Sequence, residues 1–315
     1  MATHPPSPLQ TQVGALTLTS PLMNASGTFC AETFGQCFPL NQAMGAWVSK
    51  TVLPQPSGGN AQQRTVELPR LGMLNSIGLQ GKGVMHTLDT EVPVWQGYGV
   101  PLVLSLSADS VAAFEALMQF VAQHPNRHAI SAIELNLSCP NVHGGGSLFG
   151  AQPHWVRQVV AAVKALCPYP LWVKLTPNTG EFLTVAHAAV EAGADALCAI
   201  NTVLGAHVDI HRRKPSLARI SGGYSGPGIR PIAIHHVLQL AQALPQVPLI
   251  GSGGVVSVED VLEFVMAGCS AVQIGTASFA NPLALPQLHQ GLSEWLQAQG
   301  VATLSELVGC AVPKA

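Results

Sequence analysis

Cys139 is the residue of this sequence best suited to act as a base or a nucleophile. It lies between two asparagines in the segment NLSCPN and is followed by a glycine-rich run at 142–146. A thiol can take up a proton once its pKa falls below the free value of about 8.5. A cysteine packed in the interior would explain the same spacing. His143 could tune the thiol, although its position is more typical of a solvated loop histidine.

Two lysines each end an apolar run, Lys50 in VSK and Lys174 in LWVKL. A lysine that points into buried space must find an anion or lose its charge. The chain has only 16 acidic residues, and most of them fall in predicted helices or outer loops. The pattern therefore favours contact with an anionic ligand over pairing with a neighbouring Asp or Glu.

Glycines follow two late apolar runs, as Gly253-Gly254 and as Gly275-Thr276. Glycine lets the backbone approach a ligand closely, and successive free N–H groups form a nest that holds an anion. Loops of this kind before a helix are typical of phosphate sites. Each pair could instead make only a tight turn, but the occurrence of two pairs favours a phosphate site.

Four asparagines, Asn75, Asn136, Asn141 and Asn201, are expected to converge on one opening. Their amides offer hydrogen-bond donors and acceptors in fixed directions without charge. Four of them would suit a planar ligand with several carbonyl and N–H groups, such as a pyrimidine ring. Any single one of them could instead start a turn.

Neither the cysteines nor the histidines have the spacing of a metal site. The seven cysteines include no CxxC pair, and the 12 histidines include no HxH or HExxH pattern. We therefore expect no disulfide framework, iron–sulfur cluster or metal ion in this chain. The N-terminal segment lacks the features of a signal peptide, and no apolar run approaches the ~18 residues of a membrane span. These features predict a cytoplasmic protein with reduced thiols and no membrane partner.

The composition indicates a large buried core. Of the 315 residues, 48 % are apolar and only 10 % are charged, and the net charge is −2. Such a chain does not have the composition of a disordered protein. It also offers no basic surface to nucleic acid or to anionic lipid, so neither is expected as a partner.

Short apolar runs alternate with amphipathic runs along the chain. The predicted strands are Leu22–Ser26, Trp47–Lys50, Leu102–Ser105, Ile133–Asn136, Leu171–Leu175, Ala196–Asn201, Pro248–Ser252 and Ala271–Gly275. The predicted helices are Ser110–Gln123, His154–Leu166, Phe182–Ala192, Pro231–Ala243 and Val258–Ala267. This alternation predicts a parallel sheet of the α/β class.

Eight such units, without a glycine-rich dinucleotide turn after the first strand, favour a closed (β/α)8 TIM barrel. A doubly wound open sheet is the alternative. We predict a single domain over residues 1–315, with a short N-terminal extension at 1–20. The segments 55–70, 139–150 and 205–228 are too long for simple turns and are expected to be binding loops over the top face. Function should then collect at the carboxyl ends of the strands.

The same motifs, in the same order, resemble the dihydroorotate dehydrogenase family of flavin enzymes. The resemblance runs from about Leu16 to Pro282. It rests on NASG at 24–27, VSKT at 48–51, MLNSIGL at 73–79, ELNLSCPN at 134–141, WVKLTPN at 172–178, INT at 200–202, SGGYSGP at 221–227, GSGG at 251–254 and QIGT at 273–276. The family implies an α/β barrel that holds FMN at the carboxyl-terminal mouth of its strands.

The resemblance implies roles for the residues that match these motifs. FMN contacts are implied for Ser26, Lys50, Thr51, Asn136, Lys174, Ile200, Gly226, Gly253, Gly254, Gly275 and Thr276. Contacts with the pyrimidine substrate are implied for Lys50, Asn75, Ser76, Ile77, Gly78, Leu79, Asn136, Asn141, Asn201 and Thr202. Cys139 would be the catalytic base, and a cysteine there resembles the soluble class 1 enzymes, because the membrane-bound quinone class has serine.

The implied activity is FMN-dependent oxidation of (S)-dihydroorotate to orotate in de novo pyrimidine biosynthesis. Cys139 would remove the C5 proton while flavin N5 accepts the C6 hydride. Lys174 would stabilise negative charge at the N1/O2 edge of the flavin, and Lys50 would pair with the substrate carboxylate. The nearest rival is a dihydropyrimidine dehydrogenase-like enzyme that acts on uracil or thymine, a family with histidine where this chain has Asn141.

Within class 1, the chain looks most like the catalytic subunit of the NAD-using, two-subunit type. That type implies a homodimer and a second subunit that carries FAD and a 2Fe–2S cluster. Ser105 stands where that type usually has asparagine, whereas the fumarate-using type can have serine. The sequence therefore leaves the electron acceptor open between NAD, reached through a partner subunit, and fumarate. It assigns no role to Ser105 or His143.

Overall fold

Eight parallel strands form one sheet in the order β3-β16-β15-β10-β9-β8-β7-β4. The structure is a computed structural model that describes residues 7–29, 36–138 and 149–313. The strands are β3 (Leu22–Asn24), β4 (Trp47–Val48), β7 (Leu102–Leu106), β8 (Ile130–Asn136), β9 (Leu171–Leu175), β10 (Ala196–Ala199), β15 (Leu249–Ser252) and β16 (Cys269–Ile274). Nearly all of their residues are buried, as expected for strands that have helices on one side and a packed interior on the other.

The outermost strands of this order, β3 and β4, close the sheet into a barrel. Met23 forms a parallel bridge with Ala46 just before β4. The Asn24 side chain extends this seam, because its amide donates to the Val48 carbonyl at 2.7 Å and accepts from the Val48 N–H at 2.9 Å. One amide side chain thus replaces two ladder hydrogen bonds where the strands are short. The predicted (β/α)8 barrel is confirmed.

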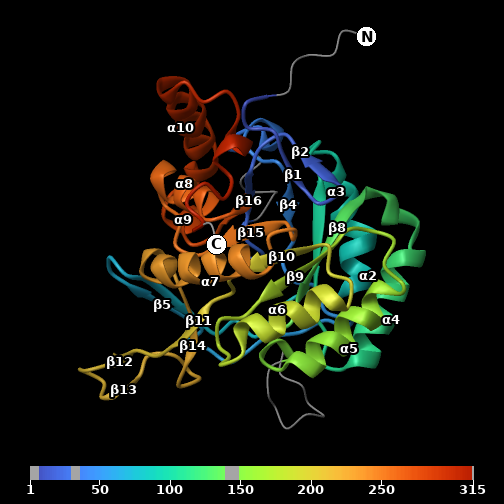
Figure 1. Cartoon of the computed structure of the whole chain (residues 1–315). Coiled ribbons are helices and arrows are strands. Elements are labelled where there is room, and N and C mark those ends of the chain that lie inside the picture. The colour runs from blue at the N-terminus through green and yellow to red at the C-terminus, as the bar shows by residue number, and fades with distance from the viewer. Residues whose placement is uncertain (1–6, 30–35, 139–148, 314–315) are drawn as a thin grey trace.

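Helices form the outer layer of the barrel (Figure 1). The longer ones are α4 (Val111–Gln123), α5 (Pro153–Lys164), α6 (Phe182–Glu191), α7 (Arg230–Ala243), α8 (Val258–Met266) and α10 (Ala284–Gln299). The Ser110 hydroxyl caps α4 by accepting from the Ala113 N–H at 3.2 Å, and Ser257 with Asp260 forms a capping box at α8. The five predicted helices are confirmed, with ends shifted by at most two residues. In the described part of the chain, no helix is long and apolar enough to cross a lipid bilayer.

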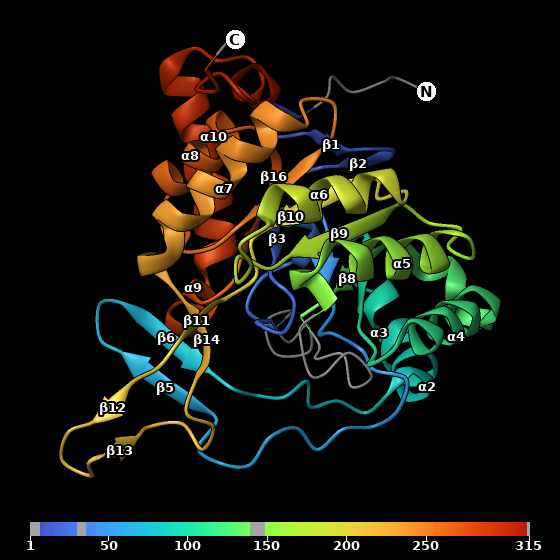
Figure 2. The ribbon, with the colours of Figure 1, turned by 60° about the horizontal axis from the view of Figure 1, so that its bottom comes forward.

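Two segments predicted as binding loops contain short strands. The segment 55–70 contains β5 (Thr65–Leu68), and 205–228 contains β12 (Val208–Asp209), β13 (Lys214–Pro215) and β14 (Gly222–Ser225). An antiparallel sheet runs from β5 through β6 (Gly72–Asn75) and β14 to β11 (Val203–Gly205). Figure 2 shows these four strands side by side next to the barrel. Only the expected lack of regular structure was wrong, because this sheet pairs residues as distant as Asn75 and Gly223, which local periodicity does not reveal. Both segments contribute to the cavity wall, for example through Asn60 and Gly223.

Four predicted barrel strands end earlier in the structure than in the prediction. The first ends at Asn24 instead of Ser26, the second at Val48 instead of Lys50, the sixth at Ala199 instead of Asn201, and the eighth at Ile274 instead of Gly275. The polar residues therefore lie in the loops just beyond the strands. Of the third expected loop, 139–150, only the last two residues are described, in a short 3-10 helix at Phe149–Ala151.

An N-terminal hairpin covers the amino-terminal end of the barrel. Its strands, β1 (Thr11–Val13) and β2 (Leu16–Leu18), pair antiparallel. Val13 and Leu18 are fully buried and pack in one cluster with interior barrel residues such as Met23 and Trp172. Figure 1 shows this hairpin and the β12–β13 hairpin at opposite ends of the molecule. The barrel interior is therefore a packed core, and a ligand site has to form at the other, carboxyl-terminal end.

Candidate active site

A cavity of about 980 Å³ opens at the carboxyl-terminal ends of the barrel strands. This volume lies at the top of the range of ~300–1,000 Å³ typical of ligand pockets. Its wall includes Ser26, Lys50, Thr51, Asn75, Ser76, Ile77, Gly78, Leu79, Asn136, Lys174, Ile200, Asn201, Thr202, Gly226, Gly253, Gly254, Gly275 and Thr276. These are all of the expected site residues that the structure describes. Cys139, Asn141 and His143 lie outside the described residues.

Hydroxyl groups from three loops form one part of this wall. Thr51 Oγ1 lies 3.1 Å from Ser26 Oγ and 3.0 Å from Ser105 Oγ, and it accepts a hydrogen bond from Asn136 Nδ2 at 3.1 Å. Ser26 also donates to the Ser49 carbonyl at 2.9 Å. These contacts fix the hydroxyls in place across the ends of β3, β4, β7 and β8. Ser105, which has no role assigned from the sequence, is fully buried and supports Thr51.

Amide groups continue the wall from β8 to β10 and beyond. Asn201 Nδ2 donates to Asn136 Oδ1 at 3.2 Å and to Ser138 Oγ at 2.7 Å. Across the cavity, Asn75 Nδ2 donates to the Gly223 carbonyl at 3.3 Å, which links β6 to β14. Three of the four asparagines expected to converge therefore face the same space. Because hydrogen bonds hold these amides in place, their remaining donors and acceptors have fixed directions.

Lys50 is the more exposed of the two lysines in the wall. Burial of its amine lowers the pKa of Lys50 below the ordinary value of 10.5, and the nearby Arg64 guanidinium lowers it further. Arg64 itself donates to the Gly58 carbonyl at 2.8 Å and to Gln80 Oε1 at 2.7 Å. It thereby fastens the loop before β5 to the loop after β6. Two cationic groups at this point make the region attractive to an anionic ligand.

Lys174 is the buried lysine of the wall, with an exposed fraction of 6 %. Its Nζ donates to Gln273 Oε1 at 2.7 Å, and Gln273 Nε2 in turn donates to Glu134 Oε2 at 2.7 Å. Neither Gln273 nor Glu134 was identified as a functional residue from the sequence. The available signal was a polar residue at an inward-facing position of a buried strand, in ELN and in QIG.

The glycine loops form a tight cradle at the edge of the cavity. Gly253 and Gly254 have φ values of +137° and +77°, which favour glycine. A Cβ atom at Gly254 would lie 2.8 Å from the Gly226 carbonyl oxygen and 2.9 Å from the Arg230 amide nitrogen. Thr276 Oγ1 donates to Ser225 Oγ at 2.8 Å on the other side. The cradle presents backbone rather than side chains, as phosphate sites of barrels do.

The Arg230 guanidinium beside this cradle is already paired. It forms an ion pair with Asp260 and a second one with Glu263 Oε2 at 3.0 Å. Asp260 also accepts hydrogen bonds from the N–H groups of Val256 and Ser257, at 2.8 and 3.0 Å. An anion bound in the cradle would therefore rely on backbone N–H groups and on the start of α7.

Two cysteines of the barrel strands are core thiols. Cys198 and Cys269 are fully buried. Burial raises the pKa of the Cys198 thiol to about 12 and raises the pKa of Cys269 well above its ordinary value. Both remain protonated at neutral pH, so neither can supply a thiolate base. Among the described residues, no three His, Cys, Asp or Glu side chains are grouped so that they could hold a metal ion.

The fold and the cavity together define an α/β-barrel protein with a large cavity at the carboxyl ends of its strands, lined by lysine, asparagine and glycine residues. Residues 8–296 match the family model described as dihydroorotate dehydrogenase. The chain belongs to the dihydroorotate dehydrogenase family.

Similar proteins carry one shared name, dihydroorotate dehydrogenase B (NAD(+)), catalytic subunit. The protein from Trichlorobacter lovleyi is 41 % identical over 302 residues, which cover 96 % of this chain and 97 % of the relative. The protein from Pelobacter propionicus is 43 % identical over 298 residues, which cover 94 % and 96 %. The protein from Listeria monocytogenes is 39 % identical over 300 residues, which cover 95 % and 97 %.

Proposed function

We propose that the chain oxidises (S)-dihydroorotate to orotate, with FMN as its cofactor, in de novo pyrimidine biosynthesis. The observation that carries this proposal is the convergence of two lysines, three asparagines and two glycine loops on one cavity. Those groups come from seven separate segments of the chain, and a packing role does not require them to meet. Family membership and the names of the relatives support the same reaction.

The chemistry of the cavity wall suits FMN. The cradle of Gly253 and Gly254 would receive the phosphate, because residues without side chains leave backbone N–H groups open to an anion, and a Cβ at Gly254 would collide with neighbouring backbone. Lys174 would stabilise the negative charge that reduction places on the flavin. Ser26 and Thr51 would offer hydroxyl groups to the ring system. When bound, FMN supplies the acceptor for the hydride that leaves C6 of the substrate.

The same cavity offers contacts that match the groups of dihydroorotate. The amides of Asn75, Asn136 and Asn201 would bind the ring carbonyl and N–H groups. Lys50 would pair with the carboxylate, with backbone support from the loop that contains Ile77 and Gly78. Dihydroorotate has a carboxylate that Lys50 could bind, whereas uracil and thymine have no carboxylate.

Cys139 would remove the C5 proton as the hydride leaves C6. Ser138, which precedes it in the sequence, lines the cavity. The other barrel thiol nearby, Cys198, is unsuited to the task because burial raises its pKa to about 12. The resemblance of the segment NLSCPN to the family motif supports the base role of Cys139, which a thiolate can perform.

The electrons would leave through a second protein. Relatives of this chain are named catalytic subunits of an NAD(+) type, which implies an electron-transfer partner. We propose a homodimer of this chain with a subunit that carries FAD and a 2Fe–2S cluster, with NAD as the acceptor, and a cytoplasmic location. Fumarate is the competing acceptor. An anaerobic assay of the isolated chain should show fumarate unable to reoxidise the flavin, and rapid reoxidation by fumarate would overturn the NAD assignment.

The proposed reaction has a direct test. We expect the purified chain to be yellow, to release FMN on denaturation, and to lose its flavin absorbance when dihydroorotate is added without oxygen. Dihydrouracil serves as the matched control, since it has the same ring without the carboxylate. Bleaching by dihydrouracil and not by dihydroorotate would instead indicate a dihydropyrimidine dehydrogenase-like enzyme.

A further inference from the structure

A chain of polar side chains crosses the barrel interior beside the cavity. It runs from Glu134 on β8 through Gln273 on β16 to Lys174 on β9, with both hydrogen bonds at 2.7 Å. The exposed fractions of the three residues are 0 %, 1 % and 6 %. A carboxylate and an ammonium group are thus joined by one amide in a region that water does not reach.

The orientation of the Gln273 amide is fixed by its neighbours. An amide oxygen only accepts hydrogen bonds, and an amide NH2 only donates them. Gln273 Oε1 faces two donors, Lys174 Nζ at 2.7 Å and Cys198 Sγ at 3.3 Å. Its NH2 faces the Glu134 carboxylate, which is an acceptor. The partially negative oxygen of the amide therefore faces Lys174, and its NH2 group faces Glu134.

This arrangement is costly if its only role is stability. Glu134 Oε1 is buried and has no hydrogen-bond partner among the described residues, and the same holds for Nε1 of Trp172, its register neighbour on β9. Buried charges carry a desolvation penalty, and apolar residues of similar volume often stabilise a core better. The other residues that fill the barrel interior are apolar, for example Ala132, Val103 and Ile250. A specific use of the Glu134 charge is the simplest reason for its position.

We propose that Glu134 is a positioning residue that holds the Lys174 ammonium, through Gln273, against the inner wall of the flavin site. This inference rests on the proposed FMN site. A buried ammonium without a countercharge either loses its proton or turns out into the cavity. Glu134 would supply that countercharge from behind, through the Gln273 amide that binds Lys174 Nζ.

Sulfite provides a readout that does not depend on turnover. Its sulfur lone pair forms a bond to N5 of oxidised flavin, and the displaced electron pair moves to the N1–C2=O edge. A fixed positive charge at that edge stabilises the adduct, so the sulfite Kd reports the charge that Lys174 presents. The adduct is measured by the loss of flavin absorbance in the purified holoprotein.

Glu134→Gln removes the charge and keeps the shape of the side chain. We expect it to weaken sulfite binding by about tenfold, the loss of one charge-assisted contact. The double variant Glu134→Gln/Gln273→Glu restores a carboxylate among these polar side chains. That carboxylate would contact Lys174 directly and accept a hydrogen bond from the amide introduced at position 134. We expect this swap to restore the sulfite Kd to within about threefold of the unmodified protein, because the countercharge is back.

Asp195→Asn is the matched control. It removes a carboxylate from another lysine pair, Lys164 Nζ–Asp195 Oδ2 at 2.6 Å, which lies at the other end of β10. We expect its sulfite Kd to equal that of the unmodified protein. Unchanged or tighter sulfite binding in Glu134→Gln would overturn the proposal. If Glu134→Gln does not fold, the double variant Glu134→Gln/Gln273→Glu decides. The proposal is supported if the double variant folds and binds sulfite normally, and it is contradicted if the double variant folds no better than Glu134→Gln.

The proposed function is tested separately in the same samples. If the unmodified protein binds FMN and is reduced by dihydroorotate, the proposed reaction stands whatever the sulfite comparison shows. If it binds no FMN, the proposed function fails first.

Discussion

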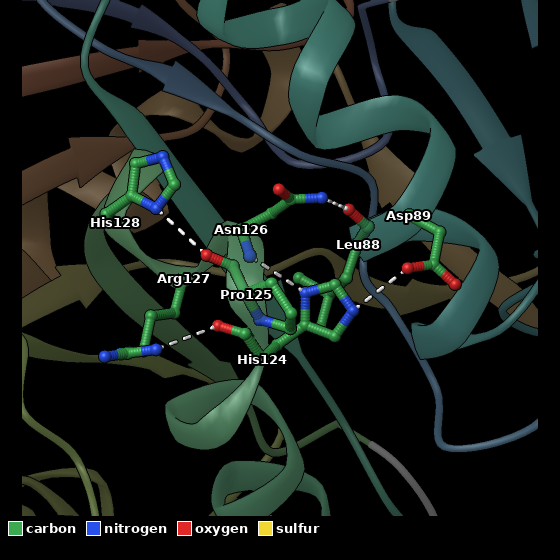
Figure 3. A network of polar contacts seen from close by, with 7 residues as sticks. All are labelled: Leu88, Asp89, His124, Pro125, Asn126, Arg127 and His128. Atoms are coloured by element: carbon green, nitrogen blue, oxygen red, sulfur yellow. Dashed lines mark hydrogen bonds and ion pairs between the residues drawn. The ribbon is translucent and has the colours of Figure 1, made fainter.

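The two ends of the barrel use polar side chains in different ways. At the carboxyl-terminal end, Lys50, Lys174 and the asparagines line a cavity and retain donors or acceptors that point into it. At the amino-terminal end, the segment between α4 and β8 forms a compact network in which the polar groups bind one another (Figure 3). One end is arranged for a ligand, and the other is arranged to hold the chain together.

His124 is the centre of that network. Its Nδ1 accepts from the Asn126 N–H at 3.2 Å, so Nε2 carries the proton and faces Asp89 Oδ1 at 3.1 Å. Asn126 Nδ2 donates to the Leu88 carbonyl at 2.9 Å, and the Arg127 guanidinium donates to the His124 carbonyl at 3.4 Å. These contacts join the turn before β8 to the short helices before β7. Figure 3 shows the His124 ring directed at the Asp89 carboxylate and the side chains of Asn126, Arg127 and His128 directed at backbone carbonyls.

The difference between the two ends indicates which polar residues are functional. A histidine beside an aspartate looks like catalytic machinery, yet here both ring nitrogens already have partners within the fold. Lys174 and Asn136 are equally buried but border a cavity. Substitutions at the amino-terminal end should therefore change stability, and substitutions at the carboxyl-terminal end should change ligand binding and chemistry.

The largest expected effect is at Cys139. Replacing it with alanine removes the proposed base and should slow anaerobic flavin reduction by dihydroorotate by about 10²–10⁴-fold. Orotate binding, followed by the flavin spectrum, should change little, because the amides and Lys50 remain. Stopped-flow reduction of the alanine variant at the unmodified rate would remove Cys139 from the base role.

The glycine cradle provides the next test. In Gly254→Ala the new Cβ meets backbone atoms at 2.8 and 2.9 Å, so we expect FMN to bind about 1–3 kcal/mol more weakly. Gly300→Ala is the control, because Gly300 also has a positive φ, of +67°, but open space around its Cβ. Titration of the apoprotein with FMN should separate the two variants. Equal FMN affinities would show that the cradle does not hold the phosphate.

A third test uses the pH dependence at Lys50. Only the protonated amine pairs with a carboxylate, and burial and Arg64 lower its pKa below 10.5. Orotate affinity should therefore be lost as the pH rises through this lowered pKa, by up to about tenfold per pH unit, and be retained at lower pH. The dependence should disappear in Lys50→Gln. If that variant keeps the same alkaline loss, another group controls binding.

The smallest effect is expected at the amino-terminal end. His124→Ala should lower the free energy of unfolding by about 1 kcal/mol, because it removes two hydrogen bonds of ordinary strength. Chemical denaturation would measure this change. FMN and orotate affinities should remain those of the unmodified protein, and a loss of either would erase the proposed distinction between the two ends.

Much of the site could be predicted because its residues directly follow the short apolar runs that form the barrel strands. Lysines, asparagines and glycines that follow short apolar runs must meet at one edge once the strands are parallel, and the described ones do. Glu134 and Gln273 were missed because their contact joins residues 139 positions apart. No local pattern distinguishes that contact from an ordinary buried strand position. The same limit hid the sheet that joins β6 to β14 and the Asn24 amide that closes the barrel.

The central claim is that the carboxyl-terminal cavity holds FMN and the pyrimidine together, and a crystal structure of the chain grown with FMN and orotate tests it most directly. We predict the phosphate on Gly253 and Gly254, the flavin ring beside Lys174, and orotate between the ring and the asparagine amides. Flavin density elsewhere on the barrel, or orotate bound away from Lys50, would contradict the account.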